Sequence, residues 1–154
     1  MSNPDSYLLE RSLFIPRPRG EVFAFFSDAC NLERITPAFL RFHILTPGPI
    51  PMRPGTIIDY ELRLYGIRFH WKTLILEFAP ESSFVDTQLT GPYRRWHHTH
   101  TFEDVSGGTR MSDRVEYEMP LGPIGAVTRA LFVRRSLDRI FDHRNKTITE
   151  IFSR

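Results

Sequence analysis

Two histidines and one aspartate are the residues of this sequence whose spacing points most directly to chemistry. His98 and His100 alternate with Trp96 and Phe102, so in a β-strand all four side chains project from one face. The two aromatic residues indicate that this face is the inner one. In the last predicted strand the same alternation places Asp113 on the more apolar face. An inward carboxylate close to inward imidazoles predicts a polar group inside the protein.

An arginine joins this group from the end of the chain. Residues 122–152 carry apolar side chains at spacings of three and four, which predicts a long amphipathic α-helix. The apolar stripe consists of Val127, Ala130, Leu131, Leu137, Ile140, Phe141, Ile148, Ile151 and Phe152. Arg144 lies on the same stripe, between Phe141 and Ile148. Because a buried arginine needs a partner, we expect Arg144 to lie near Asp113 or Asp86.

The same residues are also consistent with a structural role, since buried histidines and Arg–Asp pairs often satisfy only one another. A metal site is a further alternative, in which Asp113 would complete a ligand set with His98 and His100. The sequence contains no HExxH, paired CxxC or EF-hand spacing, and we expect neither a metal nor another cofactor. Cys30 has no histidine near it in the sequence and no nucleophile elbow around it, so we expect a buried, unreactive thiol.

Length and composition predict a globular protein. The 154 residues are 41% apolar and 25% charged, which fits one domain over residues 1–154 with a single core. The net charge of +2 comes from scattered arginines and does not indicate nucleic-acid binding. One cysteine excludes an intrachain disulfide. We expect a cytoplasmic protein, because the start does not resemble a signal peptide and no apolar run approaches the roughly 20 residues of a membrane span.

The order of predicted elements indicates an α+β fold. We expect a strand at 7–15, short helices at 20–28 and 31–36, strands at 41–46, 56–65, 67–78, 83–90, 94–104 and 109–118, and the helix at 122–152. Short Gly- and Pro-containing turns connect the later strands, which predicts an antiparallel meander. A sheet that covers so long a helix must curve around it, and a cavity is easily left between the two. In the strand at 83–90, alternation does not decide which face is inward.

Together with the order of elements, several sequence segments carry a resemblance to a known family. They are Phe84-Val85-Asp86-Thr87-Gln88, Gly91-Pro92-Tyr93, Trp96 through Phe102, Gly108-Thr109, Asp113, Tyr117 and Pro120. The chain resembles the SRPBCC ligand-binding proteins of the START/Bet v 1-like superfamily, which includes polyketide cyclases and coenzyme Q-binding proteins. The resemblance implies a helix-grip fold, with a seven-stranded curved antiparallel sheet around the C-terminal helix and an internal apolar cavity. No catalytic motif of a named cyclase maps onto these residues.

The leading hypothesis is therefore a protein that binds a small, mostly apolar molecule, such as an aromatic, polyketide, isoprenoid or lipid-like compound, in that cavity. The expected cavity residues are Trp71, Trp96, His98, His100, Phe102, Asp113, Tyr117, Phe141 and Arg144. The alternative is a cyclase or dehydratase that uses a cavity histidine with support from aspartate and arginine. A third alternative is a partner-binding module without a cavity. Separately from these functions, outward aromatic residues around Tyr65, Phe69 and Trp71 are a candidate dimer interface.

Overall fold

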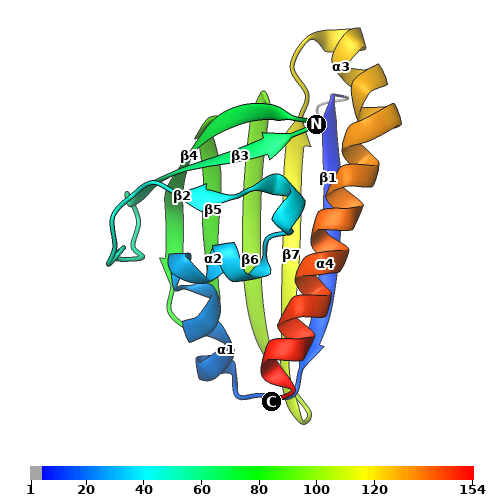
Figure 1. Cartoon of the computed structure of the whole chain (residues 1–154). Coiled ribbons are helices and arrows are strands. Elements are labelled where there is room, and N and C mark those ends of the chain that lie inside the picture. The colour runs from blue at the N-terminus through cyan, green and yellow to red at the C-terminus, as the bar shows by residue number, and fades with distance from the viewer. Residues whose placement is uncertain (1–4) are drawn as a thin grey trace.

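A single antiparallel sheet of seven strands organises the protein (Figure 1). The computed structural model describes residues 5–154. The strands are β1 Ser6–Ile15, β2 His43–Ile44, β3 Ile57–Leu64, β4 Ile67–Ala79, β5 Ser83–Thr90, β6 Arg95–Val105 and β7 Gly108–Glu118. Their order in the sheet is β1-β7-β6-β5-β4-β3-β2, and every neighbouring pair is antiparallel. Strands β2 to β7 form the meander that the short turns predict, and β1 is the edge strand that pairs with β7.

The helical segments lie on one side of the sheet, with α4 running alongside β1 (Figure 1). The segments are α1 Arg19–Phe26, η1 Ala29–Asn31, α2 Leu32–Ile35, η2 Ala38–Leu40, α3 Gly122–Thr128, η3 Arg129–Val133 and α4 Arg134–Phe152. Segments η1 and η2 are 3₁₀-helices, and η3 is a π-helix inside the long C-terminal helix. The predicted helix-grip architecture is confirmed. Among residues 5–154, no helix is long and apolar enough to cross a membrane.

The C-terminal helix buries only the later part of its predicted stripe. Leu137, Phe141, Arg144, Ile148 and Phe152 are buried against the sheet. In contrast, Val127, Ala130 and Leu131 are exposed, so their predicted burial is wrong. The reason is positional, because α3 lies at the end of the sheet, where the helix has no broad surface beneath it (Figure 1).

Strand β2 is shorter than predicted, covering His43–Ile44 rather than 41–46. Before it, Arg41 adopts a left-handed backbone conformation with φ of 46° as the preceding 3₁₀-helix ends, which delays the strand. After it, the backbone amides of Leu45 and Thr46 both donate to the carbonyl oxygen of Asp59. Two donors that share one acceptor cannot continue a regular ladder, so the strand ends there.

The core consists of two large apolar clusters along the helix. The first surrounds α1 and the end of α4 and contains Ile15, Phe23, Phe26, Phe84, Phe102, Ile148 and Phe152 among others. The second includes Leu9, Trp71, Trp96, Tyr117, Leu137 and Phe141. His100 stacks on Phe84 of the first cluster, while His98 contacts Trp96 and Phe141 of the second. The buried histidines therefore lie where the two clusters meet.

Candidate functional site

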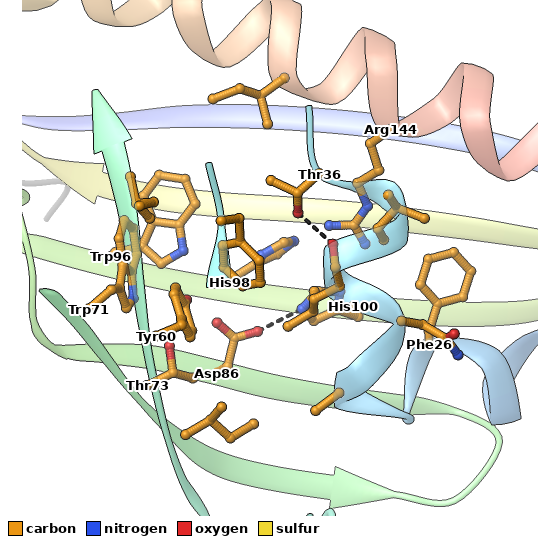
Figure 2. A pocket seen from close by; sticks show the side chains of 18 of the residues that line it. Phe26, Thr36, Tyr60, Trp71, Thr73, Asp86, Trp96, His98, His100 and Arg144 are labelled. Atoms are coloured by element: carbon orange, nitrogen blue, oxygen red, sulfur yellow. Dashed lines mark hydrogen bonds and ion pairs between the residues drawn. The ribbon is translucent and has the colours of Figure 1, made fainter. Parts of the chain in front are cut away.

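A cavity of about 180 Å³ lies between the sheet and the helices. Its wall is formed by side chains from β3 to β6, α2 and α4, with contributions from α1 and the segments around it. Most of the lining is apolar and includes Phe26, Ile35, Leu40, Leu62, Trp71, Ile75, Trp96 and Phe141. Figure 2 shows Asp86, His98, His100 and Arg144 directed toward the same region from different elements. The cavity is thus an apolar chamber with one concentrated polar region.

Strand alternation positions the histidines of this region. Along β6, Trp96, His98, His100 and Phe102 are all buried, whereas the intervening residues are more exposed, as predicted. In the β6–β7 register His100 lies opposite Asp113, and in the β5–β6 register His98 lies opposite Asp86. Directly opposed residues share a face of the sheet, so both aspartates point inward with the histidines.

Asp113 is the centre of the polar group. Its Oδ1 atom lies 2.8 Å from Nε2 of His98, 3.2 Å from Nδ1 of His100 and 3.3 Å from Nη2 of Arg144. The predicted pairing of Arg144 with Asp113 is therefore confirmed. The guanidinium group of Arg144 also lies near the rings of Phe26 and Phe141, at 5.5 and 5.6 Å from their centroids. The arginine is thus held by one charge and two aromatic faces.

Asp86 forms a second pair at the edge of the group. Its Oδ2 atom lies 2.7 Å from Nε2 of His100, and this contact is drawn in Figure 2. Its side chain keeps 16% exposure, compared with 2% for that of Asp113. Asp86 lines the cavity, whereas Asp113 lies behind the histidines and does not.

Both carboxyl groups are held in the ionised form. Burial alone would raise the pKa of Asp113, but the charge of Arg144 and hydrogen bonds from the two histidines hold that pKa well below its usual value. Burial also opposes ionisation of Asp86. The hydrogen bond from His100 and the nearby positive charges outweigh it, so the pKa of Asp86 is lowered as well.

The pKa values of the two histidines are shifted in opposite directions. Burial lowers the pKa of His98, and the charge of His100 lowers it further, so His98 is neutral. Burial also acts against the protonated form of His100, yet the carboxylates of Asp113 and Asp86 prevail and raise the pKa of His100. A carboxylate at each ring nitrogen stabilises the doubly protonated ring of His100.

This charge pattern leaves specific hydrogen-bonding capacity at the cavity. Neutral His98 donates its Nε2 hydrogen to Asp113, so Nδ1 carries a lone pair, and no described residue hydrogen-bonds to that nitrogen. The Nε–H of Arg144 also has no hydrogen-bond partner within residues 5–154, but this atom is buried and does not face open space. The wall can therefore accept a proton or a hydrogen bond at Nδ1 of His98.

The donor atoms of Asp86, His98 and His100 lie within 4.8 Å of one another, a spacing compatible with metal binding. The rings of His98 and His100, however, are stacked with centroids 3.7 Å apart and planes inclined by 28°. Imidazole lone pairs lie in the ring plane, so two stacked rings direct them along nearly parallel planes. Convergence on one ion at about 2.0–2.1 Å would require both rings to turn. The observed geometry favours hydrogen bonding over coordination.

Six of the nine predicted cavity residues line the cavity: Trp71, Trp96, His98, His100, Phe141 and Arg144. Phe102, Asp113 and Tyr117 are buried but lie outside its wall. Phe102 packs against Phe23 and Phe26 in the first apolar cluster, with ring centroids 5.1 and 5.6 Å apart. Tyr117 packs against Tyr7 and accepts a hydrogen bond from Nε of Arg129.

The prediction did not place Asp86, Tyr60 or Thr73 among the cavity residues, yet all three line the wall. In β5 both Phe84 and Val85 are buried, so alternation gives no clear inward face. Register shifts between β4 and β5 further interrupt the pattern. The pairing of β5 with β6 shows which face Asp86 is on, because Asp86 lies directly opposite the inward His98.

One alternative and one expectation are corrected. Trp71 is buried in the cavity wall, as the leading hypothesis places it, so the alternative that puts it on an outer aromatic surface with Tyr65 is wrong. Cys30 is exposed rather than buried. It lies in the short helix η1, where the side chain of Asp28 accepts a hydrogen bond from the Cys30 amide and directs the turn toward the surface.

The fold is shared with several solved structures. The Zhui aromatase/cyclase from Streptomyces sp. R1128 superposes with a TM-score of 0.76 at 12% identity, covering 97% of this chain and 94% of that one. The protein TTHA0849 from Thermus thermophilus gives 0.70 at 18% identity, with 94% of each chain covered. Ara h 8.0201 gives 0.59 at 15% identity, covering 93% of this chain and 97% of that chain. At these identities the likeness shows the fold alone.

At the sequence level, residues 15–142 match the family described as polyketide cyclase / dehydrase and lipid transport. No curated protein matches the sequence.

Proposed function

Because the chain belongs to the polyketide cyclase / dehydrase and lipid transport family, we propose that it binds a small, largely apolar molecule in its internal cavity. The observation that carries this proposal is the apolar chamber with a single polar region made by Asp86, His98, His100 and Arg144. Such a combination orients a ligand through a few hydrogen bonds while apolar contacts provide most of the affinity.

The charges of the polar region favour a neutral ligand. Asp86 and Asp113 are ionised, while Arg144 and His100, whose pKa is raised toward the protonated form, offset their charge. A carboxylate or ammonium ligand would upset this balance inside an apolar environment, whereas a hydroxyl or carbonyl group would not. Nδ1 of His98 can accept a hydrogen bond from a hydroxyl group of the ligand.

The cavity volume also limits the ligand. An engineered protein cavity of about 150 Å³ holds benzene, so about 180 Å³ suits one aromatic ring with small substituents. A longer molecule would extend past the cavity or require the short helices beside it to move.

The test is native mass spectrometry of the protein purified from its own host. We expect a co-purifying molecule that is lost in Ile75→Phe, where the larger ring fills the cavity. Leu76→Phe is the matched control, because Leu76 is the adjacent residue and its side chain is exposed. Absence of any bound molecule in the wild type, or equal occupancy in Ile75→Phe, would contradict ligand binding in this cavity.

A second candidate function, proton transfer on the bound molecule, is favoured by the pairing of His98 with Asp113. Oδ1 of Asp113 lies 2.8 Å from Nε2 of His98 and accepts its hydrogen, which leaves the free lone pair on Nδ1, the arrangement of a general base. For a cyclase or dehydratase reaction, His98 would remove a proton while Arg144 stabilises a developing oxyanion.

This candidate is tested with the molecule that co-purifies with His98→Gln, which should bind it without converting it. Incubation of that molecule with the wild-type protein should change its mass or retention in liquid chromatography. A ligand recovered unchanged after long incubation with the wild type would contradict catalysis and leave binding intact.

A further inference from the structure

The beginning of the C-terminal helix exposes a group of large apolar side chains. Leu121, Ile124, Val127, Leu131 and Phe132 form this group, here called the α3 patch, and each is between 52% and 75% exposed. Leu121 immediately precedes α3, and the other four residues belong to α3 and η3, at the end of the molecule where α3 passes the end of β1 (Figure 1). Scattered exposed apolar residues are ordinary, but five within twelve positions of one segment are an unusual concentration.

The turn between β3 and β4 extends this surface. The hydroxyl group of Tyr65 donates to the carbonyl oxygen of Phe132 at 3.0 Å, and the two rings lie 5.9 Å apart. Tyr65 and nearby Ile67 are themselves more than half exposed. The apolar face therefore continues from the helix onto the adjacent end of the sheet.

The sequence segment that carries the α3 patch is basic. From Met119 to Leu137 the sequence contains no aspartate or glutamate, but it contains Arg129, Arg134 and Arg135. None of these arginines forms an ion pair with a carboxylate of residues 5–154. Arg129 instead lies 4.0 Å above the ring of Tyr7 and hydrogen-bonds to Tyr117. Elsewhere Arg11, Arg94 and Arg114 each pair with an acidic residue.

We propose that the α3 patch docks on the surface of an anionic lipid bilayer. Protruding leucine, isoleucine and phenylalanine side chains can insert among acyl chains, while Arg134 and Arg135 meet anionic headgroups. The helix would lie in the interface and not cross it, because arginines interrupt it and no described helix is apolar enough to span. An anionic bilayer is favoured over a protein partner, because the exposed apolar side chains are accompanied in the sequence by arginines without a carboxylate partner among residues 5–154.

The patch is also close to the cavity. Leu64, which precedes Tyr65, and Leu137, which lies one turn beyond Val133, both line the cavity wall. Docking through the α3 patch would therefore bring that side of the cavity to the lipid surface. An apolar ligand could then pass between bilayer and cavity with little exposure to water.

The experiment is co-sedimentation of the full chain with vesicles of phosphatidylcholine, either pure or mixed with phosphatidylglycerol. We expect binding to the anionic vesicles, weakened by salt, and a loss of about tenfold or more in Ile124→Ser/Leu131→Ser. Arg134→Gln/Arg135→Gln should weaken binding by about fivefold for each arginine removed. Circular dichroism and thermal unfolding establish that each variant is folded.

The matched control is Phe14→Ser/Leu76→Ser, which removes two exposed apolar side chains from β1 and β4 and should leave vesicle binding unchanged. Absence of binding to anionic vesicles, or equal binding to pure phosphatidylcholine, would overturn the proposal. So would a dimer in light scattering that Ile124→Ser/Leu131→Ser converts to a monomer, because the patch would then be covered by a second copy.

Discussion

The imidazole rings of His98 and His100 stack with their centroids 3.7 Å apart, yet their pKa values are shifted in opposite directions. The difference comes from the number of carboxylates that each ring meets. His100 has one at each nitrogen, whereas His98 has Asp113 only. Once His100 is charged, its proximity disfavours a second charge on His98. Neighbouring residues of one type thereby acquire different chemical roles.

The opposite shifts can be observed by NMR titration of the histidine side chains. We expect His100 to titrate above the ordinary value of about 6.5 and His98 below it. In His100→Gln the pKa of His98 should rise, because the charge that opposes its protonation is gone. His70→Gln, which changes an exposed histidine, should leave both titrations where they are. If the pKa of His98 is the same in His100→Gln as in the wild type, the two rings are not coupled.

The free energy of unfolding should change with pH because of the ionisation of His100. Its pKa is raised on folding, so its contribution is fully present below about pH 6.5 and is lost as pH rises through the folded-state pKa. Urea unfolding from about pH 5 to about pH 9 should show this decline in the wild type. In His100→Gln that part of the decline should disappear. An identical profile for the two proteins would contradict a protonated His100.

Loss of Arg144 should be costly, because it leaves the buried carboxylate of Asp113 without its guanidinium partner. We expect Arg144→Met to lower the free energy of unfolding by about 3 kcal/mol. Arg11→Met removes an ion pair with Asp138 whose side chains are 28% and 45% exposed, and should cost less than about 1 kcal/mol. Similar costs for the two variants in urea unfolding would show that Arg144 is dispensable for stability.

Ligand binding should be visible in the intrinsic fluorescence of the protein. The chain has two tryptophans, Trp71 and Trp96, and both line the cavity with ring centroids 5.4 Å apart. A molecule that enters the cavity should shift or quench their emission during a titration. Trp71→Phe should retain the response of Trp96 at lower amplitude, whereas Ile75→Phe should lose the response. A saturable response that persists unchanged in Ile75→Phe would place binding elsewhere.

The sequence supports the prediction of the fold because its signals are local. Alternation along β6 and β7 identifies the inward faces, and the exception at Arg144 indicates that a carboxylate must be near. The role of Asp86 depends on the pairing register of β5 with β6, which no single strand encodes. The exposure of Leu131 depends on where the sheet ends beneath the helix, and helical periodicity contains no information about that.

The π-helical segment Arg129–Val133 has a consequence for the register of the whole C-terminal helix. Successive residues of an α-helix are rotated by about 100° around its axis. If the C-terminal helix were α-helical throughout, Ala126 and Ala130 would therefore lie on the same face as the buried residues of α4. Instead Gly125 is buried and Ala126 exposed, while Arg129 lies over Tyr7. The segment thus holds one residue more than two in-phase α-helices require. Deletion of exposed Ala130 would therefore convert the π-helical segment into a regular α-helix. The residues before and after it would keep their present faces, with Arg129 directed at Tyr7 and Leu137 at the sheet.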